Sequence, residues 1–374
     1  MLWDNVVGHS AVCLSLKNSV EQDRVHHAYL FTGPSGVGKF IVARTLAASM
    51  LCPEGGCGEC NVCRRVMQEK HPDVRVIRPA GKNIPVETVR EVRMDAFMKP
   101  SEGARKVYIF KGAERMWEEG ASTLLKVLEE PPGDVVFILV TANPAGVLPT
   151  IRSRCQEVSF ANVPLEQLKT YIMERKGISE ERADLVVRLT GGVLGRALDW
   201  CDEQWRLARR DNVIKAARAL KRAELNDVLQ MASELYREVR APVEELSATY
   251  QQRKRDLEDG SLDAGVVRRL SKDLDEALSR ERVKEETRGV EEIMTTLSWW
   301  YRDILVMKEG GDPGLLVNRD LTGEIEEEAE VIPTRRLLDS IDLLAGGILA
   351  AERNVPVQLN LESTLLGLQE ALYA

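Results

Sequence analysis

One stretch decides the fold of this chain, TGPSGVGKF at residues 32–40. It follows the apolar run 28–31 and opens onto the apolar segment 41–47, so a buried strand, a glycine-rich loop, a lysine and a helix come in that order. This is the order of a P-loop, in which backbone amides and the lysine bind phosphates and a Ser or Thr hydroxyl binds Mg²⁺. Phe40 stands at the hydroxyl position and has no oxygen. The stretch therefore predicts an α/β fold with a parallel sheet. The candidate nucleotide-binding residues in it are Gly33, Gly36, Gly38 and Lys39.

A second Mg²⁺ ligand is missing after the next buried strand. The run KVYIF at residues 106–110 is where a P-loop ATPase places the strand whose end carries the acid that holds Mg²⁺. Here Lys111 and Gly112 follow it, and Glu114 beyond them is interpreted as a solvated residue at a helix start. Because Phe40 and Lys111 remove two ligands of one ion, we expect no magnesium site and no ATP hydrolysis. The sequence leaves open whether ATP or ADP still binds.

Polar and basic side chains follow the third buried run, VVFILV at residues 135–140. Thr141 and Asn143 come at its carboxyl end, where α/β sheets place side chains that contact ligands. Further along, the segment LPTIRSRC at residues 148–155 carries Arg152 and Arg154 on a short helix or turn. Considered alone, such arginines are usually surface charges.

A cysteine cluster follows the predicted P-loop helix, within residues 52–63 (CPEGGCGECNVC). Two overlapping C-x₂-C steps and a further thiol supply the four sulfurs of a closed structural zinc site, and the glycines allow the backbone to turn. Reduced surface thiols are the alternative, while disulfides are not expected in a cytosolic protein. The predicted zinc ligands are Cys52, Cys57, Cys60 and Cys63.

The length and charge of the chain limit the classes of protein to which it can belong. A chain of 374 residues exceeds what one hydrophobic core usually organises, so two or three domains are expected. No apolar run approaches the roughly 20 residues of a membrane span, and the first residues lack a signal-peptide core, so a cytoplasmic protein without membrane contact is expected. The net charge of -8 argues against a chain that binds nucleic acid alone through bulk electrostatics.

Five segments of residues 1 to about 200 are similar to one family. These residues resemble the AAA+ clamp-loader ATPases, and the last two segments are the most specific. The segments are Gly8, HAYLF at 27–31, the cysteine cluster at 52–63, LLKVLEEPP at 124–132 and LPTIRSRC at 148–155.

The resemblance implies roles for several residues. Arg154 would be an arginine finger directed into the ATP site of a neighbouring subunit. Thr141 or Asn143 would belong to the first nucleotide-sensing strand, and Arg196 would be the second sensor. The partners implied are other loader subunits in a hetero-oligomeric ring, with the sliding clamp and primer-template DNA contacted through the assembled complex. Subunit stoichiometry stays open.

The sequence and the resemblance together predict three domains. Residues 1–163 would form an AAA+ P-loop domain with the zinc module at 52–63, residues 164–208 a small helical lid, and residues 209–374 a helical collar through which subunits assemble. Within the collar, residues 237–292 are rich in charge, and the break at Asp259-Gly260-Ser261 predicts a helical hairpin. A solvated hairpin is favoured over a partner-binding arm. The cluster at residues 299–301 (WWY) is interpreted as bundle core.

Two functions are consistent with these features. The first is a non-hydrolysing subunit of the sliding-clamp loader in bacterial chromosomal DNA replication, which closes the ring and supplies Arg154 in trans. The alternative is an active DNA-stimulated AAA+ ATPase, a motor-type loader subunit. The alternative requires a hydroxyl at position 40 and an acid at 111 or 112, and the chain has neither.

Overall fold

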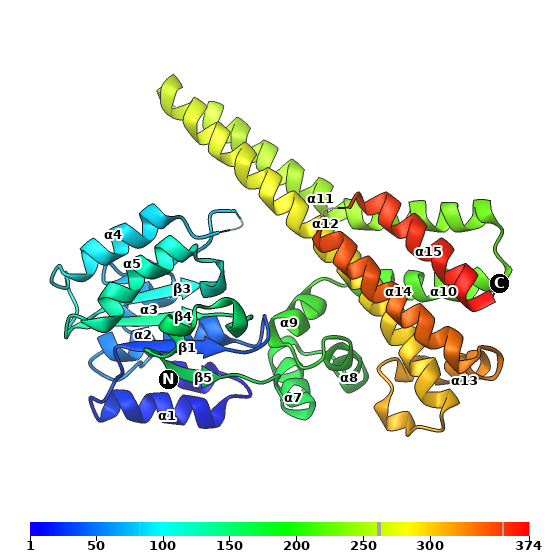
Figure 1. Cartoon of the computed structure of the whole chain (residues 1–374), viewed down its shortest axis with the longest axis horizontal. Helices are drawn as coiled ribbons and strands as arrows, with labels where there is room; N and C mark the ends of the chain where they lie inside the picture. The colour runs from blue at the N-terminus through cyan, green and yellow to red at the C-terminus, as the bar shows by residue number, and fades with distance from the viewer. Residues whose placement is uncertain (82, 260–262, 354, 374) are drawn as a thin grey trace. The chain divides into compact units, whose positions relative to one another are not determined.

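The computed structural model describes residues 1–81, 83–259, 263–353 and 355–373. They form two compact units, Met1–Asp202 and Glu203–Ala374. The first contains a sheet and the second is helical (Figure 1). The predicted fold class, α/β followed by all-α, is confirmed. The division into three domains, at 1–163, 164–208 and 209–374, stays a prediction.

A five-stranded parallel sheet with the order β2-β3-β4-β1-β5 forms the centre of the first unit. Its middle strands are buried along most of their length, as expected for a sheet covered on both faces. β1 lies between β4 and β5, so the P-loop leaves the sheet close to the carboxyl end of β4. The strands are β1 (Ala28–Thr32), β2 (Val74–Ile77), β3 (Lys106–Lys111), β4 (Val135–Val140) and β5 (Gln156–Ser159).

Helices cover the two faces of this sheet. On one face α1, α2 and α3 share an apolar core with β1, β3 and β4, and on the other α4 and α5 pack on the same strands (Figure 1). The short helices α7, α8 and α9 pack on one another after β5. The helices, with η for 3-10 helices, are η1 (Leu2–Asn5), α1 (Ser10–Glu21), α2 (Lys39–Leu51), α3 (Asn61–Met67), α4 (Val86–Ala96), η2 (Ala113–Arg115), α5 (Glu118–Glu129), η3 (Pro144–Gly146), α6 (Pro149–Arg152), α7 (Leu165–Lys176), α8 (Glu180–Leu189) and α9 (Leu194–Asp202).

The second unit is a helical assembly with one apolar core. Trp300 and Tyr301 are each 1% exposed within it, which confirms that the aromatic cluster is bundle core. Trp299 is only half-buried, and the Arg302 guanidinium lies 5.5 Å from its ring centre. The elements are α10 (Trp205–Ala219), η4 (Leu220–Arg222), α11 (Leu225–Glu258), α12 (Ala264–Lys308), η5 (Pro313–Leu315), η6 (Arg319–Leu321), α13 (Thr322–Val331), α14 (Thr334–Glu352) and α15 (Val357–Tyr373).

The two helices predicted over residues 237–292 are present as α11 and α12, and both extend further into the core. They run antiparallel (Figure 1), with ion pairs between Lys254 and Asp275 at 2.8 Å and between Arg240 and Glu286 at 3.7 Å. Residues 260 and 261 of the predicted turn lie outside the described part of the chain. The outer parts of both helices are joined mainly by such ion pairs and half-buried leucines, as a solvated hairpin requires.

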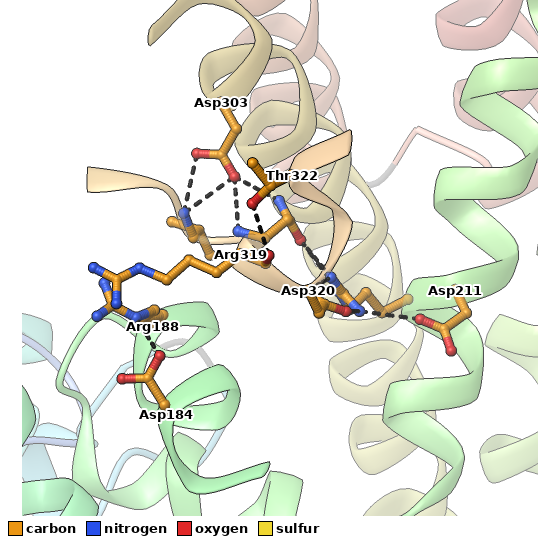
Figure 2. A network of polar contacts seen from close by, with 10 residues as sticks. Asp184, Arg188, Asp211, Asp303, Arg319, Asp320 and Thr322 are labelled. Carbon is orange, nitrogen blue, oxygen red and sulfur yellow. Dashed lines mark hydrogen bonds and ion pairs between the residues drawn. The ribbon is translucent and has the colours of Figure 1, made fainter. Parts of the chain in front are cut away.

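A buried polar network fixes the loop after α12 (Figure 2). Asp303 is fully buried, and its carboxylate accepts hydrogen bonds from the Val317 amide at 3.1 Å and from the Asn318 amide and side chain at 2.8 Å. The Asn318 side-chain oxygen in turn accepts from Arg210 at 2.9 Å, and Arg210 makes two bonds of 2.7 Å to Asp320. The network therefore joins α10, α12 and the loop before α13.

Replacing Asp303 with alanine is expected to destabilise this unit by about 3 kcal/mol. The substitution leaves three buried donors without their charged acceptor, and each loss of this kind costs about 1–3 kcal/mol before relaxation. Chemical denaturation measures the change in unfolding free energy. The control is Asp339→Ala, which alters an exposed residue of α14. Equal stability of the two variants would contradict a structural role for the network.

Candidate functional site

At Gly33 and Gly38 the P-loop backbone adopts a conformation that favours glycine. Gly33 has a φ of 131°, and a Cβ there would clash with the carbonyl oxygen of Phe160. Gly38 has a φ of 107° and is the N-cap of α2. A side chain at either position would strain the turn that directs the chain from β1 into α2. The loop therefore has the strand-turn-helix geometry of a phosphate-binding site.

The carbonyl groups of the loop are held by groups outside it. His9 Nε2 lies 2.8 Å from the Val37 oxygen, and the Gly195 amide donates to the Gly36 oxygen at 3.0 Å. Gly195 is the second residue of α9, so the helix that carries the predicted sensor Arg196 contacts the P-loop through its backbone. Arg196 itself is exposed. The structure thus brings the predicted loop and the predicted second sensor helix together.

Lys39 is buried at the start of α2. Its ammonium donates to the Pro34 oxygen at 2.5 Å and also to the Gly33 oxygen. Burial lowers the pKa of Lys39 to about 8, and the nearby Glu114 carboxylate acts in the opposite direction. Glu114 is half-buried, and its Oε2 atom is buried without a hydrogen-bond partner among the described residues. Glu114 is therefore not the solvated residue expected from the sequence, because η2 turns it back toward the P-loop lysine.

Three cations surround the ring of Phe40, which stands where a P-loop places its Mg²⁺-binding hydroxyl. The ring centre lies 4.7 Å from the Arg44 guanidinium, 5.2 Å from the Lys111 ammonium and 5.5 Å from the Arg78 guanidinium. Glu69 pairs with Arg78 at 2.6 Å and with Arg44 at 3.5 Å. Cations are favoured over the face of an aromatic ring. The position therefore holds an aromatic ring and positive charge instead of metal ligands.

Sequence reasoning identified Phe40 and Lys111 but missed Arg44 and Arg78. Arg44 follows Phe40 by four residues on one helix, a spacing that places two side chains on the same face and could have revealed it. Arg78 directly follows β2, which pairs with β3, so its proximity to Lys111 depends on the strand order. That order is not readable from the sequence around Phe40.

The predicted first sensor residues lie at the carboxyl end of β4. Thr141 is buried, and its hydroxyl accepts from the Asn143 amide at 3.0 Å. Asn143 is exposed, and its side-chain oxygen accepts from the Gly146 amide at 3.3 Å, which caps η3. Both side chains stabilise the turn after the strand. Their contact with a nucleotide stays a prediction.

Arg152 ends α6 and Arg154 follows it, and the two arginines have different partners. Arg154 pairs with Glu129 at 2.7 Å and donates to the Thr150 oxygen at 3.0 Å. Its side chain is 35% exposed, so it remains accessible from outside the unit. Arg152 lies 3.6 Å from Glu157. In the described part of the chain neither arginine bonds to the P-loop, which fits a role for Arg154 outside its own site.

The four predicted zinc ligands converge at the end of α2. The sulfur atoms of Cys52, Cys57, Cys60 and Cys63 all lie within 4.8 Å of one another. Cys52 Sγ is 3.7 Å from Cys60 Sγ and 3.8 Å from Cys57 Sγ. A tetrahedron with Zn–S bonds of about 2.3 Å has sulfur atoms about 3.8 Å apart, so the spacing fits zinc. The backbone amides of Cys60 and Cys63 point at neighbouring sulfurs at 3.4 Å, which favours thiolates.

The first unit of this chain is similar to known proteins. Residues 8–164 match the family described as DNA polymerase III, delta subunit. Two delta' subunits of DNA polymerase III are similar to parts of this chain. The delta' subunit of Bacillus subtilis (strain 168) is 36% identical over 181 residues, which are 48% of this chain and 55% of the relative. The delta' subunit of Pseudomonas aeruginosa is 43% identical over 135 residues, 34% of this chain and 41% of the relative.

A gamma/tau subunit is similar to the same degree. The DNA polymerase III subunit gamma/tau of Mycobacterium bovis is 36% identical over 197 residues, 50% of this chain and 34% of the relative. The chain thus spans about half the length, or less, of the curated relatives it matches. The resemblance to delta' is confirmed over the matched residues, but identity alone does not separate delta' from gamma/tau. Among the described residues, no helix is both long and apolar enough to cross a membrane.

Proposed function

We propose that this chain is a subunit of the sliding-clamp loader in bacterial chromosomal DNA replication and a component of the DNA polymerase III holoenzyme. It closes the loader ring without hydrolysing ATP in its own P-loop. Similarity to delta' and gamma/tau subunits supports the assignment to this assembly. The helical second unit supplies the collar through which the other subunits assemble. The clamp and primer-template DNA are contacted through the complex, consistent with a net charge of -8.

The arrangement around Phe40 carries the proposal. Mg²⁺ requires oxygen ligands at about 2.0–2.1 Å in octahedral geometry, and an aromatic ring offers none. The ammonium of Lys111 lies 5.2 Å from this ring, where an acid would be needed to hold the ion. Since Mg²⁺ bridges the β- and γ-phosphates and neutralises the developing charge, the site lacks the means to promote hydrolysis.

The isolated protein is therefore expected not to hydrolyse ATP. Phosphate release is measured with Mg²⁺ present, for the unmodified protein and for Lys39→Ala. We expect both proteins to give the rate of the buffer alone. Magnesium-dependent turnover that Lys39→Ala abolishes would contradict the proposal, because it would show that this P-loop runs the reaction.

The alternative function is an active, DNA-stimulated ATPase of the motor type, and the identity to gamma/tau favours it. An acid that could serve that chemistry is Glu114, which influences Lys39 from beyond the end of β3. The same assay, repeated with primer-template DNA, separates the two functions. DNA-stimulated turnover that is lost in Glu114→Gln would support the motor-type subunit.

In the proposed subunit Arg154 serves the ATP site of a neighbour. A guanidinium is always charged and forked, so it can neutralise charge on a transferring phosphoryl group within its reach. Here Arg154 is held by Glu129. An exposed ion pair of this kind is worth about 0–1 kcal/mol, so exchange of Glu129 for a phosphate costs little. Thr141, Asn143 and Arg196 are proposed to contact any nucleotide bound in this chain.

The cysteine cluster is proposed to hold one structural zinc ion. Four sulfur ligands fill a tetrahedral zinc, so no position remains for a reactive water. Cys52 is the C-cap of α2 and Cys63 lies in α3, so the site links the P-loop helix to the next helix. The role proposed for the metal is therefore to stabilise this part of the unit.

A further inference from the structure

We propose that a groove in the second unit binds an arginine side chain presented by a partner protein, with the Glu328 carboxylate as its counter-charge. The groove has a volume of about 860 Å³ and lies between the end of α10 with η4, the start of α11, and α13. The proposal goes beyond the clamp-loader role and does not depend on it, because it concerns the chemistry of one groove within one unit.

Glu328 is a buried acid with an unpaired oxygen. The residue is 9% exposed, and its Oε2 atom is buried without a hydrogen-bond partner among the described residues. The same residue lines the groove. A carboxylate that leaves water and gains no donor destabilises the folded state. A cation that enters the groove would supply the missing partner.

The side chains packed near Glu328 inside the unit do not supply that partner. Burial raises the pKa of the Tyr301 and Tyr373 hydroxyl groups, and the charge of Glu328 raises it further, so both stay neutral. The Tyr301 hydroxyl is itself buried without a hydrogen-bond partner in the described structure. The Lys308 ammonium, which reaches the adjacent residue of α13, donates to the Ala329 carbonyl oxygen at 2.7 Å. The positive charge must therefore come from the groove.

Two walls of the groove carry further acids. Asp227 and Glu234 of α11 line it, and so does Glu327 beside Glu328 on α13. Glu327 pairs with Arg218 at 3.4 Å. Asp227 and Glu234 each accept a hydrogen bond from a neutral group at the same end of α11, so their charges are not cancelled by these bonds. These carboxylates favour a positively charged ligand through charge complementarity.

The third wall carries two cations of η4. Lys221 and Arg222 line the groove and are exposed, and the Glu328 Oε2 atom stays without a partner in the described structure although both are present. The two cations repel a further positive charge at their own wall. We therefore expect the ligand to enter along α11 and α13, where the acids lie.

An arginine suits this groove better than a lysine. Its guanidinium presents two parallel N–H donors to a carboxylate and is more weakly hydrated than an ammonium, so its burial costs less free energy. Met231 and Val331 line the groove and offer apolar surface to the aliphatic stem. Val331 is 52% exposed, so apolar surface also remains for the residues that flank the arginine in a protein segment.

NMR of the methionine methyl groups in the full-length protein tests the proposal. The probe is the capped tripeptide acetyl-Gly-Arg-Gly-amide, and the reporter is the Met231 methyl signal, identified by its loss in Met231→Leu. We expect this signal to shift with a dissociation constant on the order of 1 mM. The matched tripeptide with citrulline, whose side chain ends in a neutral urea, should give no shift at the same concentrations.

Two variants of α13 test the role of Glu328. Glu328→Gln keeps the shape and removes the charge, and it should weaken binding of the arginine tripeptide by about tenfold or more. Glu330→Gln alters an exposed acid of the same helix that does not line the groove, and it should bind as the unmodified protein does. The melting temperature of Glu328→Gln should equal or exceed that of the unmodified protein, because the carboxylate has no partner to lose.

Several results would overturn the proposal. They are equal binding of the citrulline and arginine tripeptides, normal binding by Glu328→Gln, and equal binding of a lysine tripeptide. A marked fall in the melting temperature of Glu328→Gln would show that the carboxylate already has a partner within the protein. Free L-arginine that binds more tightly than the capped tripeptide would identify a small-molecule site and exclude a protein segment as the ligand.

Discussion

With Arg154 replaced by alanine, the reconstituted loader is expected to hydrolyse ATP and load clamps more slowly than the unmodified complex. Arginine fingers contribute roughly 10³ to 10⁵ in rate at the site they serve. Other ATP sites in the ring dilute this loss in the overall turnover. Single-turnover hydrolysis, with this chain the only altered subunit, measures the affected site. Folding, zinc content and ring assembly should be unchanged, because the Arg154 side chain is partly exposed and its ion pair with Glu129 is peripheral.

Two further substitutions serve as controls for Arg154. Arg152→Ala removes the other arginine of the segment, which pairs with Glu157, and should slow hydrolysis far less. Glu129→Gln removes the ionic partner of Arg154 and should leave hydrolysis at or above the unmodified rate, because the guanidinium is then released toward the neighbouring site. A loader with Arg154→Ala that works at the unmodified rate would rule out the trans-acting role.

The second large effect is expected on zinc content and thermal stability, when the proposed zinc site is removed. Cys60→Ser is expected to abolish zinc binding and to lower the melting temperature of the protein. Cys60 Sγ lies 3.7 Å from Cys52 Sγ, and the Cys60 side chain also accepts from the Cys63 amide at the start of α3. Structural zinc contributes about 10–16 kcal/mol of apparent binding free energy in small zinc-finger peptides. The cysteine cluster spans only residues 52–63, so we expect the unfolding to be local.

Metal analysis and thermal unfolding measure this effect. The unmodified protein, purified without chelator, should contain one zinc per chain. The control Cys155→Ser alters a half-buried cysteine outside the cluster and should keep the metal. Absence of zinc from the unmodified protein would exclude the metal site, and a melting temperature that is unchanged in Cys60→Ser would exclude its structural role.

The parts of the site that follow from local sequence were predictable. The glycines and Lys39 identify the P-loop, and Phe40 stands at the motif position where the hydroxyl is missing. Both could be recognised because the strand, loop and helix are contiguous in the sequence. The cysteine cluster was predictable for the same reason, since its four thiols lie within twelve residues. Lys111 was found because it directly follows a recognisable apolar run, and the structure makes it the last residue of β3.

The contacts between distant segments were not predictable. Arg78 reaches Phe40 only because β2 pairs with β3, and Glu114 approaches Lys39 only because η2 turns after β3. The partner of Arg154 lies on α5, 25 residues earlier in the chain. The Asp303 network likewise depends on how helices pack. Periodicity shows which face of a helix is buried, but it does not show which polar groups meet there.

The most direct test of the central claim compares two substitutions in one reconstituted loader. Lys39→Ala damages the P-loop of this chain, and Arg154→Ala removes the group proposed to act on a neighbour. Single-turnover ATP hydrolysis is measured for each complex beside the unmodified one. If this chain acts only in trans, Arg154→Ala slows hydrolysis strongly and Lys39→Ala leaves it unchanged. The reverse pattern, with hydrolysis lost in Lys39→Ala and retained in Arg154→Ala, would contradict the claim and identify this chain as an active ATPase.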